Sequence, residues 1–156
     1  GKYTIERPLH LGAVLAAPDK AEQLLPALSA YGLPLGDAFQ MRDDVMGAFG
    51  ETSVTGKPVG DDLREGKPTP LMAMATARAD AAQLGVLQLV GNTVLNDAQV
   101  ADVQTAIRET GALDQLEQLI TSLTDEAIEA IGKAPLSQEA RNELTELAAF
   151  VSWRSV

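Results

Sequence analysis

The chain has 156 residues, a formal net charge of −10, no cysteine and a single histidine. These numbers exclude disulfides, thiolate metal sites and a histidine metal cluster, and so acidic a chain lacks the basic surface that binds a nucleic-acid backbone. No apolar run approaches the roughly 20 residues of a membrane helix and no secretory leader pattern begins the chain, so we expect a soluble, cytoplasmic protein without a transmembrane segment. Alanine and leucine, both strong helix formers, predict an all-α fold in one domain, residues 1–156.

The first half of the chain has the pattern of helices followed by a long loop. Helically spaced apolar residues predict a helix over 2–17, bent or interrupted at Pro8, and a second, long and kinked helix from Pro18 to Phe49. Residues 50–70 are rich in glycine and proline and predict a loop. Its length is unusual for a compact domain and favours a functional role.

The second half is predicted to be helical. A helix over 71–89 has Gly85 as its candidate break, and Asn96 with Asp97 caps the helix that follows. We find neither the alternation of a strand nor an internal repeat. The remaining helices are expected at 98–109, at 112–131, and from Ser137 to Phe150 or beyond.

Two adjacent carboxylates stand near the C-terminal end of the long predicted helix. Asp43 and Asp44 share one side of this helix with Gln40 and Gly47, because residues three and four apart are neighbours on a helix. Their mutual repulsion, at the negative end of the helix dipole, would be relieved by a divalent cation. Carboxylate ligands alone favour a hard ion that keeps several waters, Mg²⁺ or Mn²⁺, and Mg²⁺ of this kind also binds substrate phosphates.

Lys57 and Lys67 follow on the predicted loop, each directly after a glycine. Ammonium groups beside a metal-bearing helix end suit a diphosphate. Taken singly, each feature has an ordinary structural interpretation, since an Asp-Asp pair is commonly a solvated helix end and a lysine after glycine commonly has no role. The segment 50–57 is not a nucleotide-binding phosphate loop, because its spacing is one residue too long and Pro58 stands where serine or threonine is required.

The whole segment 39–69 resembles the second aspartate-rich region of the trans-polyprenyl diphosphate synthases, above all the bacterial geranylgeranyl type. The matching residues run in order as Phe39-Gln40-x-x-Asp43-Asp44-x-x-Gly47 and then Thr55-Gly56-Lys57-Pro58-x-Gly60-x-Asp62-Leu63-x-x-Gly66-Lys67-x-Thr69. The ends of the chain agree with this resemblance. Residues 1–4 resemble the segment after the family's Lys-Thr-Gly or Lys-Ser-Gly motif, and residues 147–154 resemble its C-terminal tail.

The resemblance implies a helical bundle of the isoprenoid (terpenoid) synthase type and a Mg²⁺-dependent prenyltransferase of isoprenoid biosynthesis. In that family an allylic diphosphate ionises and alkylates isopentenyl diphosphate head to tail. The roles that the resemblance carries over are metal binding for Asp43 and Asp44, catalytic contacts near the allylic diphosphate for Lys57 and Gln40, closure over the site for Lys67, and a wall beside the isoprenoid chain for Phe39.

The sequence departs from the family pattern in two ways. Gly47 stands where many members carry a third aspartate, so a water-mediated metal ligand is lost. The family's first aspartate-rich motif and its basic residues for isopentenyl diphosphate do not occur in these 156 residues. We therefore interpret the chain as the C-terminal half of such an enzyme, inactive by itself and dependent on the missing N-terminal half.

Half a bundle exposes faces that a whole bundle would bury. We expect bare apolar faces over 11–35 and 71–89, and hence self-association as a homo-oligomer or binding to the missing half. A second hypothesis stays open, in which the chain is a non-catalytic helical partner or regulatory subunit that keeps a diphosphate-binding surface. Of the other polar residues, His10 is expected in a core or interface and Glu117 on a helix surface.

Overall fold

The computed structural model describes residues 2–50, 56 and 58–153, and its regular elements are helices, with no strand among these residues. The all-α prediction is therefore confirmed. None of the described helices is both long and apolar enough to cross a membrane. In chain order the elements are a π-helical turn η1 (Lys2–Glu6), α1 (Arg7–Ala16), a 3₁₀ turn η2 (Pro18–Lys20), α2 (Ala21–Phe49), α4 (Asp61–Glu65), α5 (Pro70–Arg78), α6 (Ala81–Leu87), α7 (Asp97–Glu109), α8 (Ala112–Gly132) and α9 (Gln138–Ser152).

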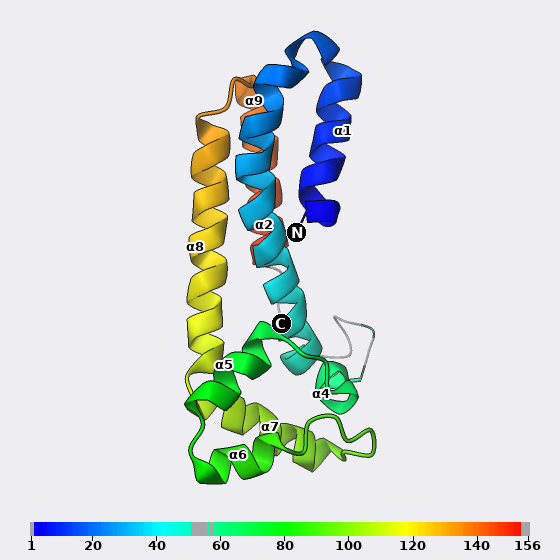
Figure 1. Ribbon diagram of the computed structural model, residues 1–156, viewed down its shortest axis with the longest axis vertical. Helices are drawn as coiled ribbons and strands as arrows, with labels where there is room; N and C mark the ends of the chain where they lie inside the picture. Colours follow the sequence, from blue (N-terminus) through cyan, green and yellow to red (C-terminus); the bar gives the residue numbers. More distant parts are fainter. Residues whose placement is uncertain (1, 51–55, 57, 154–156) are drawn as a thin grey trace. The chain divides into compact units, whose positions relative to one another are not determined.

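The described residues form two compact units. The first unit contains the chain up to Gln40 and again from Leu119, and the second contains Met41–Gln118. In the first unit, α1, the beginning of α2, the end of α8 and α9 pack around one apolar core (Figure 1). The buried members of this core are Leu24, Leu28, Tyr31, Leu35, Ala127, Ile131, Ala134, Ala148 and Val151.

The long helix predicted between Pro18 and Phe49 is present as α2, preceded by the 3₁₀ turn η2. This helix continues without interruption through two prolines, Pro26 and Pro34. A proline inside a helix costs roughly 3 kcal/mol through its missing hydrogen bond and its ring clash. Tyr31 and Leu35, both fully buried, flank Pro34, and burial of this face outweighs that cost.

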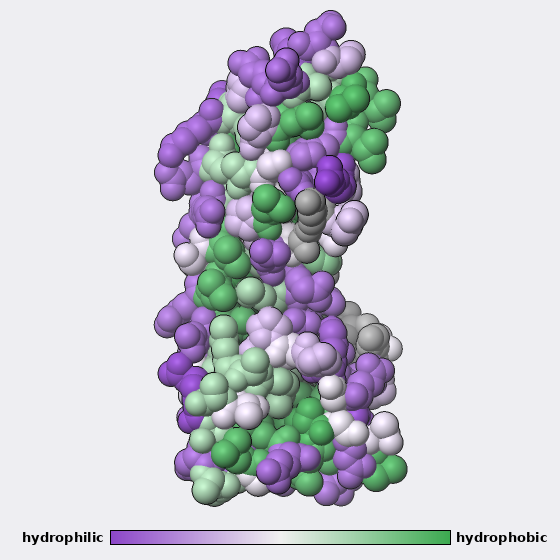
Figure 2. All heavy atoms as spheres, in the orientation of Figure 1, coloured by the Kyte–Doolittle hydropathy of each residue, from purple (hydrophilic) through white to green (hydrophobic). Residues whose placement is uncertain are grey.

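The surface of α1 is apolar and exposed, so the bare face predicted over 11–35 is present at its start. Leu11, Val14 and Leu15 all present large apolar side chains to solvent, with Leu15 80% exposed. Figure 2 shows hydrophobic side chains gathered on the face that α1 presents in this view. The prediction is wrong for the part of 11–35 that lies in α2, where Leu24, Leu28 and Leu35 are buried. The prediction of a second bare face over 71–89 is wrong, because Leu71 and Leu87 are buried in the core of the second unit.

The second unit is built from short helices, α4 to α7, with the end of α2 and the beginning of α8. The predicted helix over 71–89 is two helices, and its break lies at Ala79 and Asp80 rather than at Gly85. Asp80 caps α6 by accepting from the Gln83 N–H at 2.8 Å, while the Gln83 side chain accepts from the Asp80 N–H. This reciprocal capping box starts a new helix. Asn96 and Gln99 form the same box at α7, as predicted for Asn96.

Tyr31 makes the stability of the first unit depend on pH. Its hydroxyl donates to the Leu144 carbonyl at 2.7 Å, and burial raises the pKa of its phenol well above the usual range. The folded chain therefore keeps this proton at a pH where the unfolded chain loses it, above about 10. Stability from this group is fully present below that pH and is lost as pH rises. We expect urea unfolding midpoints to fall between pH 8 and 11 more steeply in wild type than in Tyr31→Phe; equal slopes would contradict this.

Candidate functional site

The short helix α4 lies inside the segment 50–70 that the sequence predicts as a loop, which corrects that prediction. Two glycines in the left-handed region bracket it, Gly60 with φ 70° and Gly66 with φ 69°. Each also lies too close to a neighbour for a side chain, because an added Cβ would come within 2.5 Å of Val100 Cγ1 at Gly60 and within 2.7 Å of Gly91 Cα at Gly66. The spacing of these glycines thus sets where α4 begins and ends.

Arg64 fixes α4 in place. Its guanidinium donates to the Leu95 carbonyl at 3.1 Å, to the Val59 carbonyl, and to the Asp97 carboxylate at 2.8 Å, at the start of α7. Leu63, from the adjacent position, is buried to 1% exposure. These contacts matter because Asp62, before Arg64, and Lys67, after it, are charged residues of the candidate site.

Lys67 follows directly after α4 and lies between two carboxylates. Its ammonium donates to Asp44 Oδ1 at 3.0 Å and to Asp62 Oδ2 at 3.1 Å. Burial by itself lowers the pKa of Lys67, but the hydrogen bonds and charges of the two aspartates outweigh it, so the pKa of this ammonium is raised. Lys67 is 37% exposed on its side chain, whereas Asp44 is 4% and Asp62 10% exposed. The site therefore holds a fixed ammonium that solvent can still reach.

The two adjacent aspartates of α2 have different environments. Asp44 is buried against Lys67, while Asp43 is exposed on the surface of α2. Successive helical residues point about 100° apart, which separates the two carboxylates. The described residues contain no group of three or more histidine, cysteine, aspartate or glutamate side chains placed to hold a metal ion. An ion held by Asp43 would need further ligands from water or phosphate.

The other predicted site residues are distributed as follows. Gln40 is exposed on α2 one turn before Asp43 and Asp44, and Phe39 is half-buried, packed against the core of the first unit. Lys57 lies outside the described residues. Gly47 follows on α2 and packs against Asp62. The structure thus brings Asp44, Lys67 and Asp62 together. The sequence analysis named Asp62 only within the family motif and gave it no role.

Arg42 is a residue of this unit that the sequence analysis missed. It is 4% exposed and forms a two-pronged ion pair with Glu117, with both nitrogen–oxygen distances 2.6 Å. Glu117, predicted on a helix surface, is 34% exposed on its side chain and is engaged by Arg42. One sequence signal could have identified this pair. An arginine stands beside two aspartates on a helix, and the other residues on the arginine's own face of that helix are apolar.

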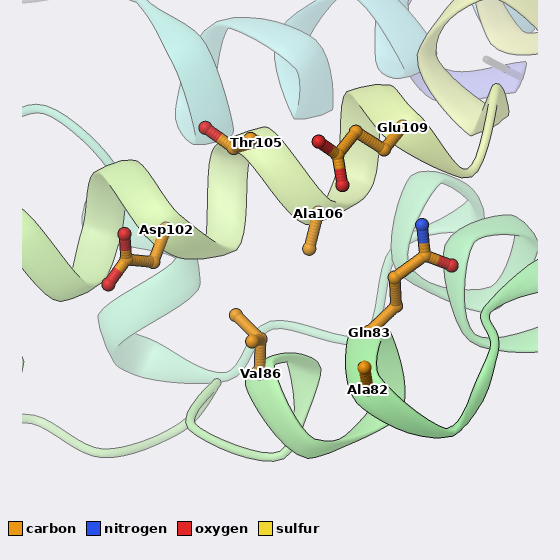
Figure 3. Close-up of a pocket in the computed structure, with 7 residues that line it drawn as sticks. All are labelled: Ala82, Gln83, Val86, Asp102, Thr105, Ala106 and Glu109. Carbon is orange, nitrogen blue, oxygen red and sulfur yellow. The ribbon is translucent and has the colours of Figure 1, made fainter.

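His10 is half-buried, as predicted, and hydrogen-bonds to Ser29 Oγ at 2.9 Å. Ser29 in turn donates to Glu6 at 2.7 Å, so the serine proton faces a carboxylate. A separate hollow of about 260 Å³ lies between α6 and α7, where Val86 and Ala106 face each other (Figure 3). The residues around it include Asp102 and Glu109 but none of the predicted site residues.

Comparison with known proteins decides the family. The family model described as polyprenyl synthetase matches residues 1–110 of the chain. The chain belongs to the polyprenyl synthetase family. Among its relatives, the geranylfarnesyl diphosphate synthase of Aeropyrum pernix is 32% identical over 143 residues, an alignment that covers 92% of this chain and 43% of that protein. The geranylgeranyl diphosphate synthase of Mycobacterium tuberculosis is 47% identical over 73 residues, which cover 46% of this chain and 20% of that protein.

Solved structures support the same assignment. A geranylgeranyl pyrophosphate synthase from Corynebacterium glutamicum, complexed with isoprenyl diphosphate and magnesium, is 39% identical with a TM-score of 0.90. The match covers 98% of this polyprenyl synthetase chain and 43% of that chain. The all-α isoprenoid synthase fold predicted from the sequence is confirmed. The chain spans less than half the length of the curated relatives it matches.

Proposed function

We propose that this chain supplies one wall of the active site of a Mg²⁺-dependent prenyltransferase. The reaction is the head-to-tail condensation of an allylic diphosphate with isopentenyl diphosphate. The bond between the allylic carbon and the diphosphate oxygen breaks with its electron pair leaving on the diphosphate. The allylic carbon then bonds to the alkene of isopentenyl diphosphate, and a proton is lost to restore a double bond.

The observation that carries this proposal is the group around Lys67. Among the described residues, the Lys67 ammonium donates to Asp44 and Asp62, which engage two of its three N–H donors, and its side chain is 37% exposed. A diphosphate oxygen is an acceptor of the right charge, and negative charge grows on it as the allylic bond breaks. A positive group held in advance stabilises that growing charge at no cost of reorganisation.

A carboxylate on the exposed side of α2 is a ligand type that magnesium accepts. Asp43 offers an exposed carboxylate, and Mg²⁺ commonly binds one or two carboxylates, several waters and substrate phosphates. When bound, the metal supplies Lewis-acid stabilisation of the leaving diphosphate. Asp44, buried against Lys67, acts as a positioning residue in this proposal.

The remaining roles rest on the resemblance. Gln40 and Lys57 would contact the diphosphate or the allylic cation, and Phe39 would line the isoprenoid chain. The opposing wall, with the first aspartate-rich motif and the isopentenyl diphosphate site, comes in this proposal from an N-terminal half outside these 156 residues. The active form is proposed as a homo-oligomer in the cytoplasm.

The test is Mg²⁺-dependent diphosphate release from an allylic diphosphate and isopentenyl diphosphate, measured on this chain alone and on the intact enzyme that contains it. We expect turnover in the intact enzyme and none in the chain alone. Turnover by neither, together with retained binding of inorganic diphosphate, would favour the second hypothesis, a non-catalytic partner with a diphosphate-binding surface. Omitting magnesium should abolish turnover, and turnover in a chelator would contradict the metal assignment.

The exposed face of α1 leads to a prediction about assembly. Leu11, Val14 and Leu15 expose apolar surface that water disfavours, so the isolated chain should associate through it. Light scattering should give a mass above the 16.4 kDa of one chain, and Leu11→Lys with Leu15→Lys should shift it toward that value. The matched control is Val94→Lys, which removes an exposed apolar side chain from the second unit. A wild-type chain that stays monomeric would rule out this association.

A further inference from the structure

Gly47 and Asp62 occupy each other's space. A Cβ built on Gly47 would meet both carboxylate oxygens and Cγ of Asp62 at less than the 3.0 Å below which Cβ atoms essentially never approach. The side chain of Asp62 is 10% exposed, so its carboxylate is enclosed where it lies against α2. At this position of the helix, a carboxylate from α4 fills the place where a side chain of residue 47 would begin.

The oxygen of Asp62 that crowds position 47 is also the one that binds Lys67. Asp62 Oδ2 accepts from the Lys67 ammonium at 3.1 Å, and it is the atom nearest to the added Cβ. Asp44 stands three residues before Gly47 on α2, and its carboxylate accepts a second hydrogen bond from the same ammonium. Any side chain at position 47 therefore displaces the Asp62 oxygen from Lys67.

Asp62 has little freedom to move away. It lies in the first turn of α4, a five-residue helix closed at one end by Gly60 against Val100 and at the other by Gly66 against Gly91. Arg64 fastens the same helix to Leu95 and Asp97. A displaced carboxylate would have to rotate away from Lys67, because the helix that carries it is fixed at both ends.

We propose that Asp62, whose carboxylate lies where a side chain at position 47 would begin, is a positioning residue which holds Lys67 for a diphosphate. This inference rests on the proposed function for the diphosphate and on geometry alone for the exclusion between Gly47 and Asp62. Gly47→Asp is harmful in this chain, because the new side chain meets the Asp62 carboxylate.

The first test is a double-mutant cycle on the thermal unfolding of the 156-residue chain. Gly to Ala inside a helix ordinarily stabilises, so the control Gly85→Ala, whose added Cβ meets nothing within 4 Å, should raise the unfolding midpoint. Gly47→Ala should lower it. In an Asp62→Ala background, Gly47→Ala should lose its harmful effect and behave as Gly85→Ala does. A midpoint raised by Gly47→Ala in the wild-type background would overturn the proposed exclusion.

The second test measures binding of inorganic diphosphate with magnesium chloride by titration calorimetry on the same chain. Asp62→Ala should weaken binding about tenfold, the size of one charge-assisted contact. Asp62→Asn, which keeps an acceptor oxygen and the volume, should recover part of it, and Gly47→Asp should resemble Asp62→Ala. The combination of Gly47→Asp with Asp62→Ala should bind better than Gly47→Asp alone, because the new carboxylate then enters vacated space.

The outcomes separate the two ideas. Unchanged binding in Asp62→Ala, with binding lost in Lys67→Ala, would show that Asp62 does not position Lys67. No binding by the wild-type chain would count against the diphosphate site and so against the positioning role. The unfolding cycle would still decide whether Asp62 and Gly47 exclude each other, because that readout needs no ligand.

Discussion

Replacing Asp43 by asparagine is expected to lower kcat of the intact enzyme by about 10² to 10³. Removing one group that stabilises transition-state charge commonly has an effect of this order. Asp43 is the exposed carboxylate next to Asp44 on α2, and asparagine keeps its shape while removing its charge. The magnesium concentration for half-maximal rate should rise in the same variant. Steady-state kinetics over a magnesium series measures both effects.

A matched control separates metal binding from a general loss of negative charge. Asp125 is also an exposed aspartate in the middle of a helix, α8, and Asp125→Asn should leave kcat and the magnesium dependence unchanged. The thermal midpoint of Asp43→Asn should stay close to that of wild type, because an exposed side chain contributes little to folding. Equal kinetics for Asp43→Asn and wild type would remove Asp43 from the site.

Replacing Arg42 by methionine is expected to destabilise the chain by about 2 to 4 kcal/mol. Hydrogen bonds to charged groups contribute more than neutral ones, and breaking an ion pair with a buried member costs several kcal/mol. Arg42 is 4% exposed and donates twice to Glu117, which would lose this partner while one third exposed. Methionine keeps much of the buried volume, so the loss reports the polar contacts. Urea unfolding followed by circular dichroism gives the difference.

The control for this variant is an ion pair of the same type on the surface. Lys133 and Glu129 pair across one helical turn, and their side chains are 74% and 70% exposed. Lys133→Met should leave the urea midpoint unchanged, since water screens such pairs. If Arg42→Met proves as mild as Lys133→Met, the pair with Glu117 is not a determinant of stability.

The sequence predicts those helices whose signals are local. Asn96 with Gln99 begins α7, and Ser137 caps α9 by accepting from the Ala140 N–H, both as expected from the cap residues alone. The break at Asp80 has the same kind of local signal, because Asp80 and Gln83 form a capping box, and this signal outweighs the glycine at position 85. Helix α4 could not be predicted, because five residues between glycines are too few to show a helical spacing of apolar residues. The helix forms through contacts with α7 and Gly91.

The candidate site divides in the same way. The residues of the motif could be found from their order, because the spacing of Asp43, Asp44 and Lys67 is a property of the sequence. The different environments of Asp43 and Asp44 could not be predicted from the sequence. They depend on which side of α2 Lys67 contacts, and the position of α4 decides that. The role of Gly47 likewise needs a contact between residues fifteen positions apart, and no local pattern reports it.

The fastening of α4 by Arg64 has a consequence for hydrogen exchange. A five-residue helix has too few internal hydrogen bonds to persist by itself. Its amide protons should therefore exchange only when the loop before α7 and the first turn of α7 open with it, as one cooperative unit. Asp62 and Lys67 would then share a single free energy of opening. That free energy would be set by the capped helix α7, although the ion pairs of Lys67 are with Asp44 and Asp62 and not with α7. Protection of the Lys67 amide, which donates to the Asp62 carbonyl, would follow the strength of the Asn96 cap.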